Sequence, residues 1–422
     1  MMDLVIYNAS QVVTVAAHGE RCKRGRDMRD IGVIEDGAVA IKDGRIVFVG
    51  PSDDIDIADA ERSINAWGKT VLPGFVDSHT HLVFAGAREE ECARRIAGAT
   101  YAEIAASGGG INTTVKATRA ATAIELIEYA LHRLDSCLGF GSTTVEIKSG
   151  YGLDVANEIK MLEVIAELKQ LHVVDIVPTF LGAHTIPFDY KERREEYLRM
   201  VLEEMLPVVA ERRLAEYCDV FAERGAFSID EARMIFEHAK ALGLRPRLHA
   251  DQITAGGGSE LAASMGAASA DHLDHISPDG IAAMREAGTI ATLLPGVSLF
   301  LGERMPDARA LIDAGLPVAV ATDANPGSCM SENIQLMMSL ASLQMRMTME
   351  ETITAVTLNA AAALDRSDRL GSLEVGKQAD VLIFDVPNYH RIMYHFGVNH
   401  LGTVIKNGKV VLERHYAEER PA

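Results

Sequence analysis

Short apolar runs rich in Val, Ile and Ala lie near both ends of the chain, and such runs are typical of β-strands. They occupy residues 3–7, 37–50, 379–385 and 404–411. Asp43-Gly44 interrupts one run and Asn407-Gly408 another. Because both dipeptides favour the tight turn of a hairpin, each of these two runs predicts a pair of strands. We therefore expect one small β-domain assembled from the two chain ends.

Between these ends, apolar runs alternate with segments whose apolar residues recur every three or four positions, as in an amphipathic helix. The runs lie at 71–77, 143–148, 175–184, 247–251, 268–272, 289–294 and 317–323. The clearest helical segments lie at 122–138, 155–171 and 228–242. This alternation predicts a parallel sheet closed into a (β/α)₈ barrel. An eighth strand, second in order, is expected between Arg88 and Thr114, where no strand pattern is visible.

The length of the chain fits a barrel and one smaller domain. A barrel alone takes about 250 residues, and the chain has 422. We expect the fold class α/β, a TIM-like (β/α)₈ barrel with a β-sandwich domain formed from both termini. The expected boundaries are 1–68 and 369–422 for the two parts of the sandwich and 69–368 for the barrel.

Charge and cysteine content narrow the choice of partners. The formal net charge of −19 repels phosphate backbones and anionic lipid, so neither nucleic acid nor a membrane is an expected partner. The five cysteines are scattered and form no Cys-x-x-Cys pair, which favours a reducing, cytoplasmic location. Neither a secretory signal nor an apolar stretch of roughly 20 residues is visible. A small molecule is the expected partner.

The strongest local motif is residues 71–81, Val-Leu-Pro-Gly-Phe-Val-Asp-Ser-His-Thr-His. His79 and His81 lie two positions apart at the end of a predicted strand, so both side chains point to the same face. An isolated His-x-His is more often a pair of unrelated loop residues. The apolar strand and the Pro-Gly turn before it favour a metal site here.

Polar residues also end four later predicted strands. They are His184, His249, His272 and Asp323. A single His at a strand end is more often a packed core residue. In a (β/α)₈ barrel, however, the carboxyl ends of the strands meet at one face, where active sites lie. Four such residues in order after the His-x-His motif therefore predict one shared site.

Three neutral imidazoles and one carboxylate suit a single zinc or iron ion with room for a water molecule. We expect His79, His81, His249 and Asp323 to bind one Zn²⁺ or Fe²⁺/Fe³⁺ ion. Such an ion lowers the pKa of its water from 15.7 to about 7. Asp323 is the expected proton carrier, and His272 is a second candidate.

At this point the chain resembles the amidohydrolase superfamily over nearly its whole length, from the terminal β-domain to the strand-end His and Asp. Members with two metals carry a carbamylated Lys on the fourth strand. By the strand count above, that place holds His184, which favours one metal. Lys148, assigned to the third strand, is expected to be a structural ion-pair partner.

Within the superfamily, four segments are similar to the imidazolonepropionase family: 79–90, 146–153, 179–184 and 321–328. This family opens the ring of 4-imidazolone-5-propanoate with water to give N-formimidoyl-L-glutamate, in histidine degradation. The resemblance implies a hydrolase of cyclic amide C–N bonds that is usually a homodimer.

The resemblance also gives roles to residues that would otherwise be interpreted as turn, packing or surface positions. Arg88 can hold the propanoate carboxylate with two parallel hydrogen bonds. Tyr151 offers a hydroxyl group and a ring face, and His184 can donate to the ring carbonyl oxygen. The carboxylate or product is also expected to contact Asn325, Gly327 and Ser328.

Gln252 distinguishes between two activities. In deaminase relatives a Glu at this place, three residues after the strand-five His, carries protons to a ring nitrogen. An amide only donates and accepts hydrogen bonds, so Gln252 is expected to orient the substrate ring. The first alternative, an aminohydrolase (deaminase) of a purine, pyrimidine or triazine, is therefore less favoured. The second alternative is a noncatalytic assembly protein of the same fold, but such chains usually lose ligands that are all present here.

Overall fold

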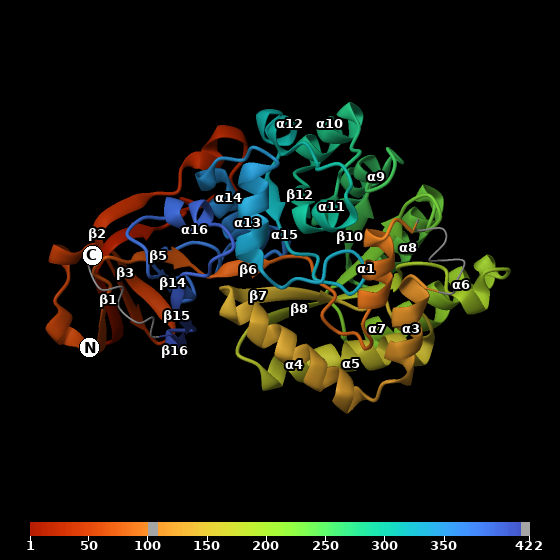
Figure 1. The fold of residues 1–422 in the computed structure, drawn as a ribbon, viewed down its shortest axis with the longest axis horizontal. Helices are drawn as coiled ribbons and strands as arrows, with labels where there is room; N and C mark the ends of the chain where they lie inside the picture. The colour runs from red at the N-terminus through yellow and green to blue at the C-terminus, as the bar shows by residue number, and fades with distance from the viewer. Residues whose placement is uncertain (100–108, 415–422) are drawn as a thin grey trace.

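The computed structural model describes residues 1–99 and 109–414. Its larger part is a sheet of eight parallel strands, each paired with the next in chain order. They are β6 (Phe75–Asp77), β7 (Ser142–Lys148), β8 (Asp175–Ala183), β9 (Tyr217–Ala222), β10 (Arg245–Ala250), β11 (Ser269–His272), β12 (Ile290–Leu293) and β13 (Val318–Val320). Beyond β6 and β13, Thr80 pairs with Ala324 and the Asp323 amide donates to the His79 carbonyl. These contacts close the circle, and the expected barrel is confirmed (Figure 1).

Helices follow the barrel strands and lie around the barrel, and the last helix belongs to the C-terminal segment beyond the barrel (Figure 1). They are α1 (Glu89–Ile96), α3 (Ile111–Ala120), α4 (Ala123–Gly139), α5 (Val155–Leu171), α6 (Arg194–Met200), α7 (Leu206–Glu211), α8 (Ile229–Ala241), α9 (Gly258–Met265), α10 (Pro278–Ala287), α11 (Pro295–Leu301), α12 (Ala308–Asp313), α13 (Ile334–Leu343), α14 (Met349–Val356), α15 (Leu358–Ala363) and α16 (His390–Tyr394). The helices predicted from periodicity correspond to α4, α5 and α8. Capping boxes at Thr122 and Ser228 fix where α4 and α8 begin. Among the described residues, no helix is both long and apolar enough to cross a membrane.

The two faces of each barrel strand have different compositions because successive side chains point in opposite directions. Val145 and Ile147 of β7 join the large apolar core that includes Leu162 of α5. Glu146 and Lys148, on the other face of β7, are also fully buried. The interior of the barrel is therefore charged, whereas its outer surface packs against apolar helix faces.

Strands from both chain ends form a second, mixed sheet, at the left of Figure 1. They are β1 (Met2–Val13), β2 (Val33–Lys42), β3 (Arg45–Pro51), β4 (Ala60–Asn65), β5 (Thr70–Pro73), β14 (Val381–Phe384), β15 (Leu401–Lys406) and β16 (Lys409–Glu413). The predicted hairpins β2–β3 and β15–β16 are confirmed. Lys406 contacts Asp175, at the start of barrel strand β8, at 2.8 Å and thereby ties this sheet to the barrel.

Two strand predictions were wrong. The run 71–77 is two strands, β5 in the terminal sheet and β6 in the barrel. The second barrel strand is β7 and does not lie between Arg88 and Thr114. There the described residues form helices α1 and α3, and 100–108 lie outside the described residues.

The barrel strand that the sequence pattern missed is the fourth, β9. Because β7 pairs directly with β6, Lys148 lies on the second strand and His184 follows the third. The fourth strand carries Asp219, and His184 does not occupy the place of the carbamylated Lys. The charge of Asp219 interrupts the apolar run of β9, which hid the strand pattern.

Candidate active site and metal centre

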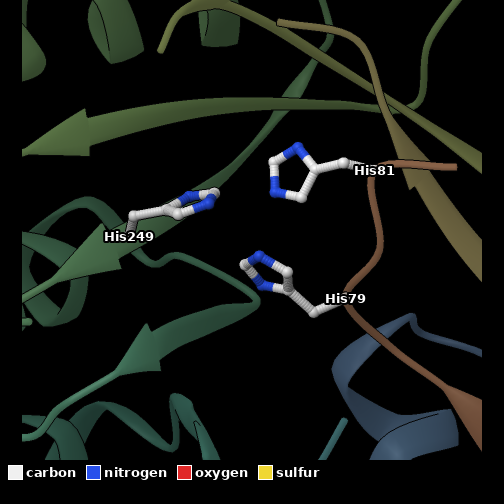
Figure 2. Close-up of side chains that lie close together, drawn as sticks. All are labelled: His79, His81 and His249. Carbon is white, nitrogen blue, oxygen red and sulfur yellow. The ribbon is translucent and has the colours of Figure 1, made fainter. Parts of the chain in front are cut away.

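Three imidazoles converge at the carboxyl ends of the barrel strands. His79 and His81 follow β6, and His249 is the penultimate residue of β10. One nitrogen from each ring lies within 4.8 Å of the others. Figure 2 shows His79 and His81 on one segment, with His249 facing them from the opposite side. The structure thus brings together three of the four predicted ligands at one point.

Asp323 lies at the same point. Its Oδ1 atom is 3.4 Å from His79 Nε2 and 3.3 Å from His81 Nε2. A nitrogen of His272 and an oxygen of Asp323 also lie within 4.8 Å of each other and of His79. The backbone of His272 and Asp323 is left-handed, with φ of 80° and 49°. Strained backbone of this kind is concentrated at functional sites in proteins, which agrees with roles for both residues.

The residues fit a bound cation. Each of the four proposed ligands has a buried polar atom without a hydrogen-bond partner among the described residues. These atoms are His79 Nε2, His81 Nδ1, both ring nitrogens of His249, and Asp323 Oδ1. Only one nitrogen of a ring can bind the shared ion, and in His249 this is Nε2, because Nδ1 lies 3.0 Å from Asp219 Oδ2. Buried polar atoms are nearly always satisfied, so this cluster requires a partner. Imidazole and carboxylate together are the donors that zinc and iron prefer.

The pKa shifts of the proposed ligands also agree with a bound cation. Burial lowers the pKa of His81 to about 4, which keeps its ring neutral, as a ligand must be. Burial and the Lys148 ammonium oppose a charge on His79, but Asp323 and Asp271 outweigh them and raise its pKa to about 9. Burial opposes ionisation of Asp323, yet His79 and His81 hold its pKa well below the usual range. The site therefore attracts positive charge.

His184 and Tyr151 form an aromatic wall beside the metal ligands. The His184 ring stacks on His81 with centroids 5.2 Å apart, and it lies 5.3 Å from Tyr151. The Nδ1 atom of His184 is 3.0 Å from the Gly150 carbonyl. A side chain on Gly150, whose φ is 110°, would begin 2.9 Å from His184 Nδ1, so this approach requires glycine.

This contact changes the role that we assign to His184. The Gly150 carbonyl only accepts, so Nδ1 carries the hydrogen atom. Burial, followed by His81 and His249, lowers the pKa of His184 well below its usual value. The ring is therefore neutral, and Nε2 is an acceptor. The predicted donation to the carbonyl oxygen would need a protonated ring, whereas this tautomer suits acceptance from a substrate N–H.

Glu158 fixes the loop 149–153 that carries Tyr151. This fully buried carboxylate accepts backbone N–H groups from Gly150 at 3.1 Å, Gly152 at 2.7 Å and Leu153 at 2.9 Å. The side chain lies in the first turn of α5, whose start is capped by Asp154. The position of Tyr151 is thus set by a helix and does not depend on loop flexibility.

Replacing Glu158 with Gln should lower kcat/KM by about 10- to 100-fold, since small displacements of a substrate-positioning group have effects of this size. The Gln amide would direct N–H groups at backbone N–H groups and loosen the loop. Steady-state kinetics would measure the change. Glu163→Gln, at an exposed position of the same helix, is the matched control. Wild-type kinetics in Glu158→Gln would show that the loop does not position the substrate.

Arg88 lies against the turn that follows Asp323. Its Nε donates to Glu91 at 2.9 Å. A Cβ atom on Gly327 would lie 2.3 Å from Arg88 Nη1, so any larger residue there would displace the guanidinium from this position. Asn325 shapes the turn, because its Oδ1 accepts the Gly327 and Ser328 N–H groups at 2.8 Å each. The structure therefore brings the predicted carboxylate-binding residues together.

Gln252 is partly buried on the loop after β10. Asp251 holds this loop by accepting from Gly256, Gly258 and Ser259. Glu223 accepts from the residues just after Gln252. The loop is well defined, and its place beside His249 is compatible with the orienting role predicted for the amide.

Sequence reasoning gave no role to several buried charges next to the site. They are Glu146, Glu158, Asp219, Arg247 and Asp271. A charge inside an apolar strand pattern, as in 217–222, was the available signal. The predicted ion pairing of Lys148 is confirmed, since its Nζ lies 2.7 Å from Glu146.

Comparison with known proteins agrees with this geometry. Residues 70–411 match the model of the amidohydrolase family. The chain is 51% identical to the imidazolonepropionase of Alkaliphilus oremlandii over 98% of this chain and 99% of that protein. It is 52% identical to that of Geobacillus kaustophilus over 98% of each. The chain belongs to the imidazolonepropionase family. Imidazolonepropionases are amidohydrolases, so the chain is a hydrolase.

Solved structures of lower identity share the fold. An adenosine deaminase from Xanthomonas campestris with bound zinc superposes with a TM-score of 0.73 at 21% identity, covering 98% of this chain and 93% of that one. A 5-methylcytosine deaminase from Klebsiella pneumoniae gives 0.74 at 20% identity, covering 99% and 100%. At such identities the likeness concerns architecture alone, and the imidazolonepropionase relationship comes from the closer sequences.

Proposed function

We propose that this imidazolonepropionase-family chain hydrolyses the ring C–N bond of 4-imidazolone-5-propanoate and releases N-formimidoyl-L-glutamate. The proposal rests on how two groups of side chains lie next to each other. Three imidazoles and Asp323 converge at a point, and Arg88 lies against the turn that directly follows Asp323. This arrangement supports a hydrolytic centre close to a group that can bind the substrate carboxylate.

One cation would be held by His79, His81, His249 and Asp323, with zinc and iron both suited to these donors. When bound, a divalent cation lowers the pKa of a water molecule from 15.7 to about 7 and polarises a carbonyl group. The fourth barrel strand carries Asp219 and no Lys, which supports a single ion.

The chain's own residues then move the proton. Asp323 Oδ1 lies toward His79 and His81, so we assign Oδ2 to accept the proton of the attacking water. The water oxygen forms a bond to the ring carbonyl carbon, the bond from that carbon to the ring nitrogen breaks, and Asp323 returns the proton to this nitrogen. We assign His272 to hydrogen-bond this water; burial lowers the pKa of His272 well below its usual value, which keeps the ring neutral.

Other residues hold the substrate. Arg88 binds the propanoate carboxylate together with the backbone of the turn at Gly327, whose shape Asn325 and Ser328 maintain. Tyr151 and His184 flank the ring, with His184 Nε2 accepting its N–H. Burial raises the pKa of Tyr151, so its hydroxyl group remains a donor. The Gln252 amide orients the ring from the loop after β10.

Replacing Arg88 with Met should raise KM for imidazolone propanoate by about 10- to 100-fold, because a charge-assisted hydrogen bond contributes roughly 1.5–3 kcal/mol. The bound metal should remain at one equivalent. Arg95→Met, on helix α1 that begins directly after Arg88, is the matched control. Equal KM values in the two variants would remove Arg88 from the substrate site.

Product analysis tests the reaction itself. The purified protein is incubated separately with imidazolone propanoate and with cytosine, guanine and adenosine. We expect N-formimidoyl-L-glutamate from the first compound and no ammonia from the others. Ammonia release from a nucleobase or nucleoside, with imidazolone propanoate unchanged, would instead establish the deaminase alternative.

We also propose that the enzyme works as a cytoplasmic homodimer on a small-molecule substrate alone. All five cysteines are free thiols in the structure, which agrees with a reducing compartment. Sedimentation velocity at micromolar concentration should give twice the 45.6 kDa chain mass. A species of single-chain mass that retains activity would refute the dimer.

A further inference from the structure

Five charged side chains form a fully buried network inside the barrel. They are Glu146 and Lys148 of β7, Asp219 of β9, Arg247 of β10 and Asp271 of β11. Transferring a charge from water into a protein core costs several kcal/mol per ion even after relaxation. Well-packed apolar residues would often serve stability as well, so the network calls for another explanation.

Two cations join the three carboxylates. Lys148 Nζ lies 2.7 Å from Glu146 Oε1 and 2.8 Å from Asp219 Oδ2. It also lies 3.8 Å from Asp271 Oδ2, which Arg247 Nη2 contacts at 3.2 Å. Arg247 is itself fixed by donation to the Ser78 carbonyl at 2.7 Å. Each carboxylate therefore has a defined position.

Two of these carboxylates contact the proposed metal ligands. Asp271 Oδ2 lies 2.7 Å from His79 Nδ1. Asp219 Oδ2 lies 3.0 Å from His249 Nδ1, and its Oδ1 accepts the His249 backbone N–H at 3.2 Å. A carboxylate beside Nδ1 favours the tautomer with hydrogen on Nδ1, which leaves Nε2 free to bind an ion.

We propose that Lys148 and Arg247 are positioning residues for the metal. They hold Asp219 and Asp271 in place, and these carboxylates set the ring orientation and tautomer of His249 and His79. The inference rests on the proposed metal site. It extends that site from four ligands to a network spanning four barrel strands.

The charges are consistent with this role. With Asp323 included, four carboxylates stand against two cations, an excess of two negative charges that one divalent ion would balance. Two effects of Lys148 predict opposite changes in cation affinity for a Lys148→Met variant. Loss of a positive charge alone would strengthen cation binding. Loss of positioning would weaken it, because Glu146 and Asp219 would repel each other and move.

Ser269 offers a test that leaves every charge unchanged. Its Oγ donates to Asp271 Oδ1 at 2.5 Å, and both side chains are buried. In Ser269→Ala, the Zn²⁺ affinity of the metal-free protein, measured by competition with a chromophoric chelator, should fall about 10-fold. Ser339→Ala, which removes a buried hydrogen bond to a helix carbonyl, is the matched control and should bind as the wild type does.

The outcomes distinguish a failure of positioning from a failure of the metal site. Weaker Zn²⁺ binding by Ser269→Ala and by Lys148→Met, with metal-free Ser269→Ala and Ser339→Ala unfolding at similar temperatures, supports the proposal. Unchanged affinity in Ser269→Ala overturns it, and so does tighter binding by Lys148→Met. If Lys148→Met does not fold, Ser269→Ala decides alone. A wild-type protein that binds no stoichiometric Zn²⁺ would refute the metal site itself, which is a different result from failure of positioning alone.

Discussion

An Asp323→Asn variant saturated with metal should lose about 10²- to 10⁴-fold in kcat, the range found for a positioned general acid or base. The amide keeps the shape of the carboxylate but does not accept a proton at neutral pH. The measurement is kcat under saturating substrate, with bound metal determined in the same sample. We expect this loss because Asp323 has two proposed roles. It lies beside His79 and His81 as a metal ligand, and it also carries the proton.

A matched control for this variant is Asp135→Asn on α4, where the carboxylate is 70% exposed and pairs with His172. It should keep wild-type kcat. If metal-loaded Asp323→Asn loses less than about 10-fold, another group carries the proton. His272, the other candidate beside Asp323, would then be the residue to replace.

Replacing His249 with Ala should remove the bound metal and reduce activity to background. His249 supplies the ligand from the side opposite to His79 and His81, so its loss leaves the ion without a ligand on that side (Figure 2). Elemental analysis after gentle purification and the rate of imidazolone propanoate loss would measure both effects. His238→Ala, an exposed His on α8, should leave both unchanged. Full metal content in His249→Ala would exclude His249 as a ligand.

The ligands could be predicted from sequence because their signal is local. His79 and His81 share one face by the two-residue period of a strand, and His249, His272 and Asp323 each end an apolar run. Once the strands form a barrel, these strand ends meet at one face, so no other contact needs to be predicted. The barrel and the terminal β-domain followed from the same local patterns.

Features that depend on long-range contacts were not predictable. Strand β9 contains Asp219, whose charge is compensated by Lys148 from β7, 71 positions earlier in the chain. The eighth strand was instead expected between Arg88 and Thr114, before β7, so Lys148 and His184 were each assigned one strand too far along. The tautomer of His184 depends on the Gly150 carbonyl, and the place of Arg88 depends on the missing side chain at Gly327. Such contacts exist only in the folded chain.

The most direct test of the central claim is the ultraviolet absorbance of imidazolone propanoate on addition of purified protein, with and without prior removal of metal by a chelator. We expect rapid loss of absorbance with the untreated protein, no loss with the metal-free protein, and recovery when one equivalent of Zn²⁺ or Fe²⁺ is returned. Full activity in protein shown by elemental analysis to contain no metal would contradict the account.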